Sequence, residues 1–218
     1  MNQQNQYIHA LRFAWLNAIY DPVVTLTSCD KRAKEKLIDQ IPSSAESILD
    51  VASGTGTLSR AISRALPAAQ VHGVDGDADM VRRATNLSLK EGSGVVYAHG
   101  FAQKLPYDSS SFDVVTSSLF FHHLMLDKKC LVLDEISRVL KPHGGLLISD
   151  WGKPINRFNR MSFLLVRCLD GFETTRENVE GKLPALVKKA GFEKVRLVSE
   201  LMAPLGTIAL ISASRKVS

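Results

Sequence analysis

The stretch LDVASGTG, residues 49–56, decides the fold of this chain. Residues 48–51 are apolar apart from Asp50, which is typical of a buried strand. The small residues SGTG follow at 53–56, and a helical pattern begins at about Thr57. Such a turn lets a ligand touch the backbone at the amino end of a helix. A tight strand-to-helix turn without a ligand has the same pattern, so this stretch by itself predicts only the turn.

A second strand pattern, residues 71–75 in VHGVDGD, ends on Asp75. An acid roughly 20 residues beyond a glycine turn is placed to accept both hydroxyls of a ribose. A strand-end aspartate also commonly caps the next helix, and this alternative stays open. The turn and the acid together favour a nucleoside site.

The glycine spacing restricts the class of nucleotide. Dinucleotide sites need a third glycine, and Ser59 stands at that position here. The glycine-lysine-serine or threonine end of a phosphate loop is missing as well. A nucleoside without phosphates, such as S-adenosylmethionine, therefore fits better than a nucleotide.

Strand and helix patterns alternate along the chain, which is typical of an α/β fold with a parallel sheet. We expect strands at residues 48–51, 71–75, 95–98, 112–117, 146–150, 195–198 and 207–213. We expect helices at residues 7–20, 30–40, 57–66, 78–89, 127–140, 155–169 and 178–190. Lys141, Pro142 and the pair Gly144-Gly145 are expected to form the turn that closes the helix at 127–140.

Four motifs occur in order: LDVASGTG, GVDGD, HGFAQKLPYDSSSFDVV at 99–115 and VLKPHGG at 139–145. Because these four motifs occur in this order, the chain resembles the class I S-adenosylmethionine-dependent methyltransferases. Within this class it resembles the ubiquinone and menaquinone biosynthesis methyltransferases. The resemblance implies a Rossmann-like three-layer sandwich, with a seven-stranded, mostly parallel sheet whose last strand is antiparallel. The length of 218 residues predicts one domain. We divide it into N-terminal helices at 1–46, a cofactor-binding core at 47–150, an apolar lid helix at 151–181, and a C-terminal helix and strand pair at 182–218.

The resemblance also implies a set of cofactor-binding residues. Asp50 and the backbone of Ala52, Ser53, Gly54 and Gly56 would hold the methionine part, and Asp75 the ribose hydroxyls. Gly76 and the backbone amide of Ala102 would meet the adenine. Ser117 and Ser118 would face the methionine carboxylate or the sulfonium, and Tyr20, in YDP, would lie over the cofactor pocket.

Two residues depart from the family pattern. Ala52 stands where a glycine is usual, and we expect little effect because alanine tolerates most backbone geometries. Phe101 stands where an aspartate usually accepts a hydrogen bond from the adenine amine. Gln103 or a backbone carbonyl could replace that acceptor, or Phe101 could pack on the adenine ring.

Methyl transfer from a sulfonium is an in-line displacement, so the enzyme mainly aligns the reactants and excludes water. An acceptor hydroxyl or carbon must also lose a proton, for which histidine is the usual base. His122 and His123 follow the fourth strand, at the sheet edge where ligands bind, and are predicted as catalytic residues. They could instead cap the helix that starts near Asp127, and Asp150 and Trp151 are rivals for contact with the acceptor.

The helix predicted at residues 155–169 has an unusually broad apolar face, whose helical spacing continues to residue 172. Its main stripe comprises Ile155, Phe158, Met161, Leu165, Leu169 and Phe172. We interpret this stripe first as packing against the sheet. The remaining apolar side chains could roof an apolar acceptor, meet a second subunit or touch a membrane surface, for which the arginines at 157, 160 and 167 are suited.

The composition excludes several classes of protein. The 218 residues contain 27 Lys and Arg against 22 Asp and Glu, and the basic residues form no run, so no nucleic-acid partner is expected. No signal peptide or membrane span is evident, which favours a cytoplasmic protein, and the three cysteines follow no metal or redox pattern. We expect a monomer or homodimer that methylates a small, apolar or aromatic acceptor; the alternative is a cofactor-binding module without catalysis.

Overall fold

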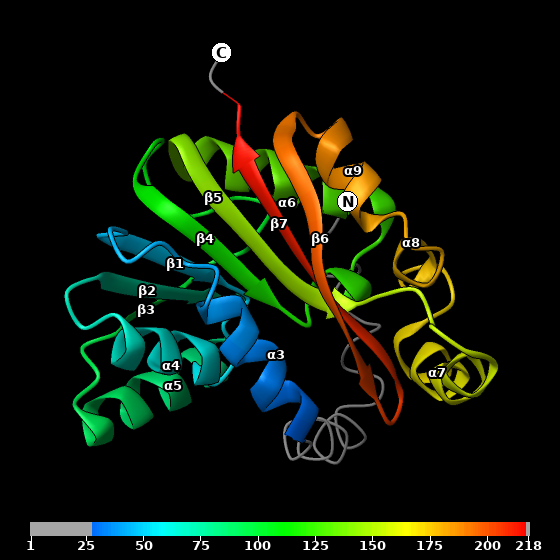
Figure 1. Cartoon of the computed structure of the whole chain (residues 1–218). Helices are drawn as coiled ribbons and strands as arrows, with labels where there is room; N and C mark the ends of the chain where they lie inside the picture. Colours follow the sequence, from blue (N-terminus) through cyan, green and yellow to red (C-terminus); the bar gives the residue numbers. More distant parts are fainter. Residues whose placement is uncertain (1–27, 217–218) are drawn as a thin grey trace, which may run out of the picture.

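The computed structural model describes residues 28–216, which form a seven-stranded sheet with helices on both faces (Figure 1). The strand order is β3-β2-β1-β4-β5-β7-β6, and β7 is antiparallel to both of its neighbours. The predicted fold class is therefore confirmed. The expected helix at residues 7–20, with Tyr20, lies outside the described residues.

The elements follow the predicted alternation. The strands are β1 Ser47–Val51, β2 Gln70–Asp75, β3 Val96–His99, β4 Phe112–Ser118, β5 Leu140–Trp151, β6 Phe192–Ala203 and β7 Gly206–Arg215. The helices are α3 Ser28–Ile38, α4 Thr57–Ala65, α5 Ala78–Glu91, the 3₁₀ turn η2 Phe121–His123, α6 Leu126–Val139, α7 Arg157–Asp170, α8 Arg176–Val179 and α9 Leu183–Lys189.

The central strands are buried on both faces, as their continuous apolar runs require. In β1, Ile48 belongs to one hydrophobic cluster and Leu49 to the cluster on the other face of the sheet, and both side chains are fully buried. Val114 and Val115 of β4 divide between the same two clusters. This packing fixes the carboxyl ends of β1 and β4 side by side.

The turn predicted at residues 141–145 is wrong. These residues lie inside β5, where a bulge places the four residues 141–144 opposite the single residue Asp113 of β4. Asp113 explains the bulge, because its carboxylate accepts hydrogen bonds from Lys141 Nζ at 2.8 Å and from the Ser47 amide at 2.9 Å. One side chain thus links three neighbouring strands.

The helix predicted at residues 178–190 is also wrong, because the chain forms two short helices there. Gly181 separates α8 from α9 with φ 69°, a left-handed conformation that glycine adopts readily. Pro184 then occupies the first turn of α9, where its missing amide costs nothing. Both signals were present in the sequence and outweigh the apolar periodicity.

Helix α7 packs by a different face from the one predicted. Phe163 and Val166 are fully buried against Trp151 and the β6–β7 hairpin, while Ile155, Phe158, Met161, Leu165 and Phe172 are exposed. The helix is apolar on two faces, and periodicity cannot tell which of them meets the protein.

Candidate functional site

The turn after β1 has a left-handed backbone at three positions. The φ angles are 58° at Ala52, 54° at Gly54 and 74° at Gly56. Glycine adopts this conformation freely, whereas alanine is strained by its Cβ. The expectation that alanine at position 52 changes little is therefore wrong: Ala52 adopts the geometry for which glycine is best suited.

Asp75, at the end of β2, fastens this turn to the next one. Its Oδ2 accepts a hydrogen bond from the Gly54 amide at 2.8 Å, and its Oδ1 accepts one from the Asp77 amide at 2.9 Å. Asp77, not Asp75, caps α5 by accepting from the amides of Asp79 and Met80. Burial raises the pKa of Asp75. Each carboxylate oxygen keeps a second lone pair that a ligand hydroxyl can use.

Asp50 lies in the core between β1, α4 and β4. Its side chain accepts hydrogen bonds from Ser59 Oγ at 2.6 Å and from Thr116 Oγ1 at 3.0 Å, and the residue is only 2% exposed. Burial raises the pKa of Asp50 to about 6, although the two hydroxyl hydrogen bonds oppose the shift. The described contacts of Asp50 thus orient the start of α4, and contact with a cofactor stays a prediction.

Two buried hydroxyls flank the turn. Ser53 Oγ, directly after β1, and Ser117 Oγ, in β4, have no hydrogen-bond partner among residues 28–216. Such groups are rare in protein interiors and suit a polar ligand. Ser117 pairs with Val51 across the two strands, and Ser118 follows it half-buried. These hydroxyls and the adjacent backbone amides fit the amino-acid part of S-adenosylmethionine.

The predicted adenine end is formed by the loops after β2 and β3. The Phe101 ring covers Gly76 so closely that an added Cβ on that glycine would lie 3.2 Å from the ring. His99 hydrogen-bonds the Gly76 carbonyl at 3.1 Å and meets the Phe101 ring edge to face. Phe101 is 51% exposed, Ala102 is buried and Gln103 is half-buried. An exposed aromatic ring beside a bare glycine suits stacking on a flat heterocycle.

The predicted cofactor residues that the structure describes therefore gather at one edge of the sheet. They lie at or just beyond the carboxyl ends of β1, β2, β3 and β4, which are the adjacent strands β3-β2-β1-β4 in space (Figure 1). The order reverses between β1 and β4, and such switch points are where open α/β sheets bind ligands. Tyr20 lies outside the described residues.

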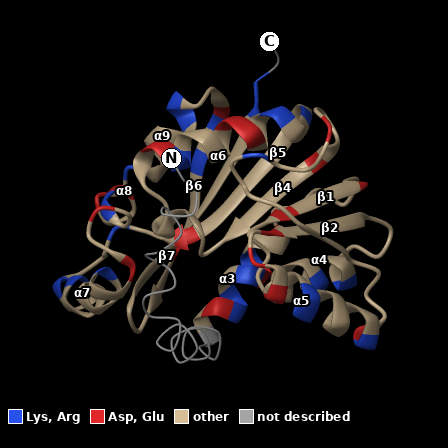
Figure 2. Ribbon diagram, turned by 180° about the vertical axis from the view of Figure 1, so that it is seen from behind, with Lys and Arg blue, Asp and Glu red and all other residues tan. Residues whose placement is uncertain are grey.

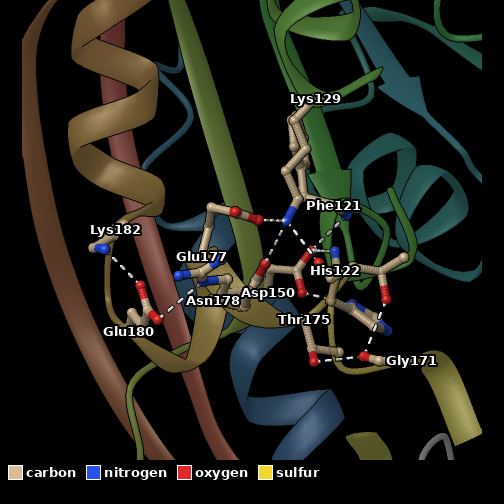
Figure 3. A network of polar contacts seen from close by, with 12 residues as sticks. Phe121, His122, Lys129, Asp150, Gly171, Thr175, Glu177, Asn178, Glu180 and Lys182 are labelled. Atoms are coloured by element: carbon tan, nitrogen blue, oxygen red, sulfur yellow. Dashed lines mark hydrogen bonds and ion pairs between the residues drawn. The ribbon is translucent and has the colours of Figure 1, made fainter. Parts of the chain in front are cut away.

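His122 lies beside this edge, held between carboxylates (Figure 3). Its Nδ1 donates to Asp150 Oδ1 at 2.6 Å, and its Nε2 lies 3.6 Å from Asp170 Oδ2. Burial opposes a positive charge, but Asp150 and Asp170 outweigh it and raise the pKa of His122. The side chain is only 2% exposed, so His122 is a buried anchor and not a group that a substrate can reach.

His123 differs from its neighbour in exposure and in charge. Its side chain is 49% exposed, and its Nδ1 lies 3.6 Å from Asp170 Oδ1. The surrounding protein lowers the pKa of His123, and the adjacent His122 ring, 3.9 Å away between centroids, acts in the same direction. The pKa of about 3 leaves this accessible imidazole neutral and able to accept a proton, but makes it a weak base.

Asp150 and Trp151 are not available to an acceptor. Asp150 is 1% exposed, and its Oδ2 accepts hydrogen bonds from the Phe120 and Phe121 amides at 3.1 and 2.7 Å, which holds η2 in place. Trp151 is 3% exposed and packs against Phe163. The carboxylate of Asp150 therefore positions the histidine turn.

Asp170 and Lys129 were missed by the sequence analysis. Lys129 of α6 is fully buried and donates to Glu177 at 2.6 Å and to the Thr174 carbonyl at 2.7 Å (Figure 3). It thereby holds the segment that follows Asp170 against the histidine turn. Both residues act across more than 40 positions of sequence, which a local pattern does not reveal.

Among the described residues, His122, His123 and Asp170 are also grouped as metal ligands could be. One potential ligand atom from each lies within 4.8 Å of the others. Two imidazoles and a carboxylate suit a divalent transition metal. A proton on His122 can neutralise the Asp170 carboxylate in place of a metal ion, and the raised pKa of the His122 ring favours the proton.

The comparisons with known proteins agree on one family. Residues 48–144 match the model of a methyltransferase domain. A ubiquinone/menaquinone biosynthesis C-methyltransferase, UbiE, of Methylococcus capsulatus is 30% identical over 173 residues, which cover 69% of this chain and 68% of the relative. UbiE of Hahella chejuensis is 36% identical over 113 residues, 50% of this chain and 45% of the relative. The chain thus spans less than two thirds of several of these relatives.

Solved structures share the fold at lower identity. The YcgJ protein of Bacillus subtilis superimposes with a TM-score of 0.72 at 18% identity, covering 86% of this chain and all of that one. The [4+2]-cyclase SpnF has a TM-score of 0.70 at 18% identity and covers 86% of this chain and 81% of its own. A fold that includes a cyclase does not by itself specify the reaction.

Proposed function

Because the chain belongs to the class I S-adenosylmethionine-dependent methyltransferases, we propose that it transfers the methyl group of S-adenosylmethionine to a small, largely apolar acceptor. The names of the relatives, which act in quinone biosynthesis, support an aromatic acceptor. The observation that carries the proposal is the left-handed turn at 52–56, joined to Asp75 through the Gly54 amide.

In this proposal the cofactor is held by groups from four loops. Asp75 accepts the ribose hydroxyls, and Ser53, Ser117 and Ser118 hold the amino-acid part. Phe101 stacks on the adenine, with the Ala102 amide and Gln103 at its edge. The position of the Phe101 ring beside Gly76 favours stacking on the adenine as the replacement for the missing aspartate, rather than a hydrogen bond to Gln103 or a backbone carbonyl.

S-adenosylmethionine supplies an electrophilic methyl group on its sulfonium. His123 takes the proton from the acceptor, because it is the accessible and neutral member of the pair. His122, fixed by Asp150, positions the turn that presents His123 and is a positioning residue. Proton removal by a placed histidine accelerates such reactions by about 10² to 10⁴.

Cofactor binding is tested by calorimetric titration of Gly54→Ala with S-adenosylhomocysteine. Gly54 has φ 54° and no atom within 4 Å of an added Cβ, so the new methyl group enters open space at the proposed cofactor turn. Gly92→Ala is the matched control, because Gly92 has φ 63°, equally open space and a place at the end of α5. We expect about tenfold weaker binding for Gly54→Ala alone. Equal affinities in both variants would overturn the site.

Catalysis is tested with an extract, methyl-labelled S-adenosylmethionine and mass spectrometry, which identifies the acceptor as a product carrying one labelled methyl. His123→Gln should then lower kcat about 10²-fold or more without changing cofactor affinity. His143→Gln, an exposed histidine in the β5 bulge, is the control. Binding without any product would favour a cofactor-binding module.

A chelator distinguishes the role of His123 as a base from the binding of a catalytic metal ion by the same histidines. Dialysis against EDTA should leave the wild-type rate unchanged. A loss of activity that a divalent cation restores would overturn the role of His123 as the base.

A further inference from the structure

Helix α7 has a second apolar face that the described protein does not cover. Its inner face, with Phe163 and Val166, packs against the sheet end, and Asn159 Nδ2 donates to the Ala203 carbonyl at 3.3 Å. Its outer face carries Phe158, Met161 and Leu165, and the stripe is extended beyond the two helix ends by Ile155 and Phe172; these five residues are 51–74% exposed. Single exposed apolar residues are normal, but a stripe at helical spacing marks an interaction surface.

Basic side chains border this outer stripe. Arg157, Arg160 and Arg167 lie on α7, and its one acidic residue, Asp170, faces the histidine pair. Arg167 lies over the Phe172 ring at 4.6 Å and donates to the Phe172 carbonyl at 3.2 Å, so it holds the end of the stripe. Figure 2 shows α7, with its basic residues in blue, at the outer edge of the molecule.

A hollow of about 340 Å³ adjoins the stripe on the same side. Lys153, Arg160 and Lys182 line it together with Pro154, Val179 and Glu180. Glu180 is paired with Lys182 at 2.6 Å and Arg176 at 3.3 Å, which leaves the hollow with net positive charge. Arg160 belongs to both the hollow and the border of the stripe, so an anion and an apolar chain can be bound side by side.

We propose that α7 docks on the surface of a membrane that contains anionic phospholipids. The outer stripe enters the boundary between headgroups and acyl chains, and the arginines and the hollow bind lipid phosphates. An apolar face with a one-sided basic border is the pattern of helices that lie in this boundary. Among residues 28–216, no helix is long and apolar enough to cross a bilayer, so the contact is peripheral.

Docking does not depend on methyl transfer. If the proposed function also holds, α7 brings the cofactor site to a bilayer in which an apolar acceptor dissolves. The two proposals fail separately, because vesicle binding is measured without cofactor or acceptor.

The test is sedimentation of the full chain with vesicles of phosphatidylcholine alone or in equal parts with phosphatidylglycerol. We expect binding to the mixed vesicles that falls with added salt, and little binding to the neutral ones. The double variant Phe158→Ser/Met161→Ser changes sites that are 74% and 70% exposed, and it should bind the mixed vesicles at least about tenfold more weakly than wild type. The double charge variant Arg157→Glu/Arg160→Glu should show the same loss.

Matched controls come from α5. Leu89→Ser removes an apolar side chain that is 75% exposed, and Arg82→Glu reverses an exposed arginine, and both should bind as wild type does. Equal binding by the α7 variants, or no binding to mixed vesicles, would overturn the proposal. Sedimentation equilibrium showing a dimer that Phe158→Ser/Met161→Ser dissociates would identify the stripe as an interface between copies instead.

Discussion

Ala52 carries conformational strain at the centre of the proposed cofactor site. Holding a residue other than glycine in the left-handed conformation costs roughly 1–2 kcal/mol of stability. Replacement by glycine relieves this strain, but it also gives the unfolded chain more conformational entropy, which offsets part of the gain. We expect Ala52→Gly to raise the free energy of unfolding by about 0.5–1 kcal/mol, measured by urea denaturation. Ala84→Gly, in the buried interior of α5, should lower it instead. The same sign in both variants would mean that Ala52 is not strained.

Asp50 makes stability depend on pH. Its folded pKa of about 6 exceeds the unfolded value of 3.8, so the folded state holds the proton more tightly. The contribution of Asp50 is therefore present below pH 4 and is lost as pH rises through 6. Wild type should lose about 2 kcal/mol of stability relative to Asp50→Asn between pH 4 and pH 7. A constant difference between the two proteins over this range, in urea denaturation, would refute the shift.

Single residues were predictable where local sequence determines their role. The glycine turn and Asp75 were located because strand-to-helix turns have a recognisable composition. Asp170 and Thr116 were not, because each meets its partner only after distant elements assemble. The strain at Ala52 was missed because composition does not give the sign of φ.

Among the elements, α6 is tied to α8 by a buried ion pair. Lys129→Met would leave the Glu177 carboxylate, only 14% exposed, without its cation. Removal of one partner of such a pair costs about 3–5 kcal/mol. We expect that loss in the free energy of unfolding, and a smaller cost for Glu177→Gln when Lys129 is already methionine.

The neighbouring Lys128 provides the control. It lies 3.9 Å from Asp127 at the surface, with 38% of its side chain exposed. Lys128→Met should change stability by less than about 1 kcal/mol. Similar losses in both lysine variants would show that the buried pair has no special weight.

Helices were predicted with unequal success. The boundaries of α4 and α5 agree with the prediction within two residues, because their ends carry clear signals. The prediction of which face of α7 packs was wrong, since both faces are apolar and only the positions of Trp151 and the β6–β7 hairpin decide between them. The buried Lys129 of α6 was missed for the same reason, because helical periodicity does not show what surrounds a side chain.

On the scale of the whole molecule, the alternation of patterns predicted an α/β sheet, and the family resemblance supplied its antiparallel last strand. The first three motifs fix β1 to β4 and carry site residues, whereas VLKPHGG carries none and its predicted turn lies inside β5. The bulge of β5 depends on Asp113 of β4, whose partners lie on β1 and β5, and no local pattern contains these contacts.

The insertion of β7 between β5 and β6 has a consequence for synthesis on the ribosome. Residues 145–151 of β5 pair with residues 208–214, which emerge some time after β5 itself. Until then, the nascent chain presents an unpaired apolar strand edge, a template for aggregation. A chain stopped after residue 191 should therefore sediment as aggregates or stay bound to chaperones, whereas the full chain is released. Release of a monomeric truncated chain would show that this edge is protected by other means.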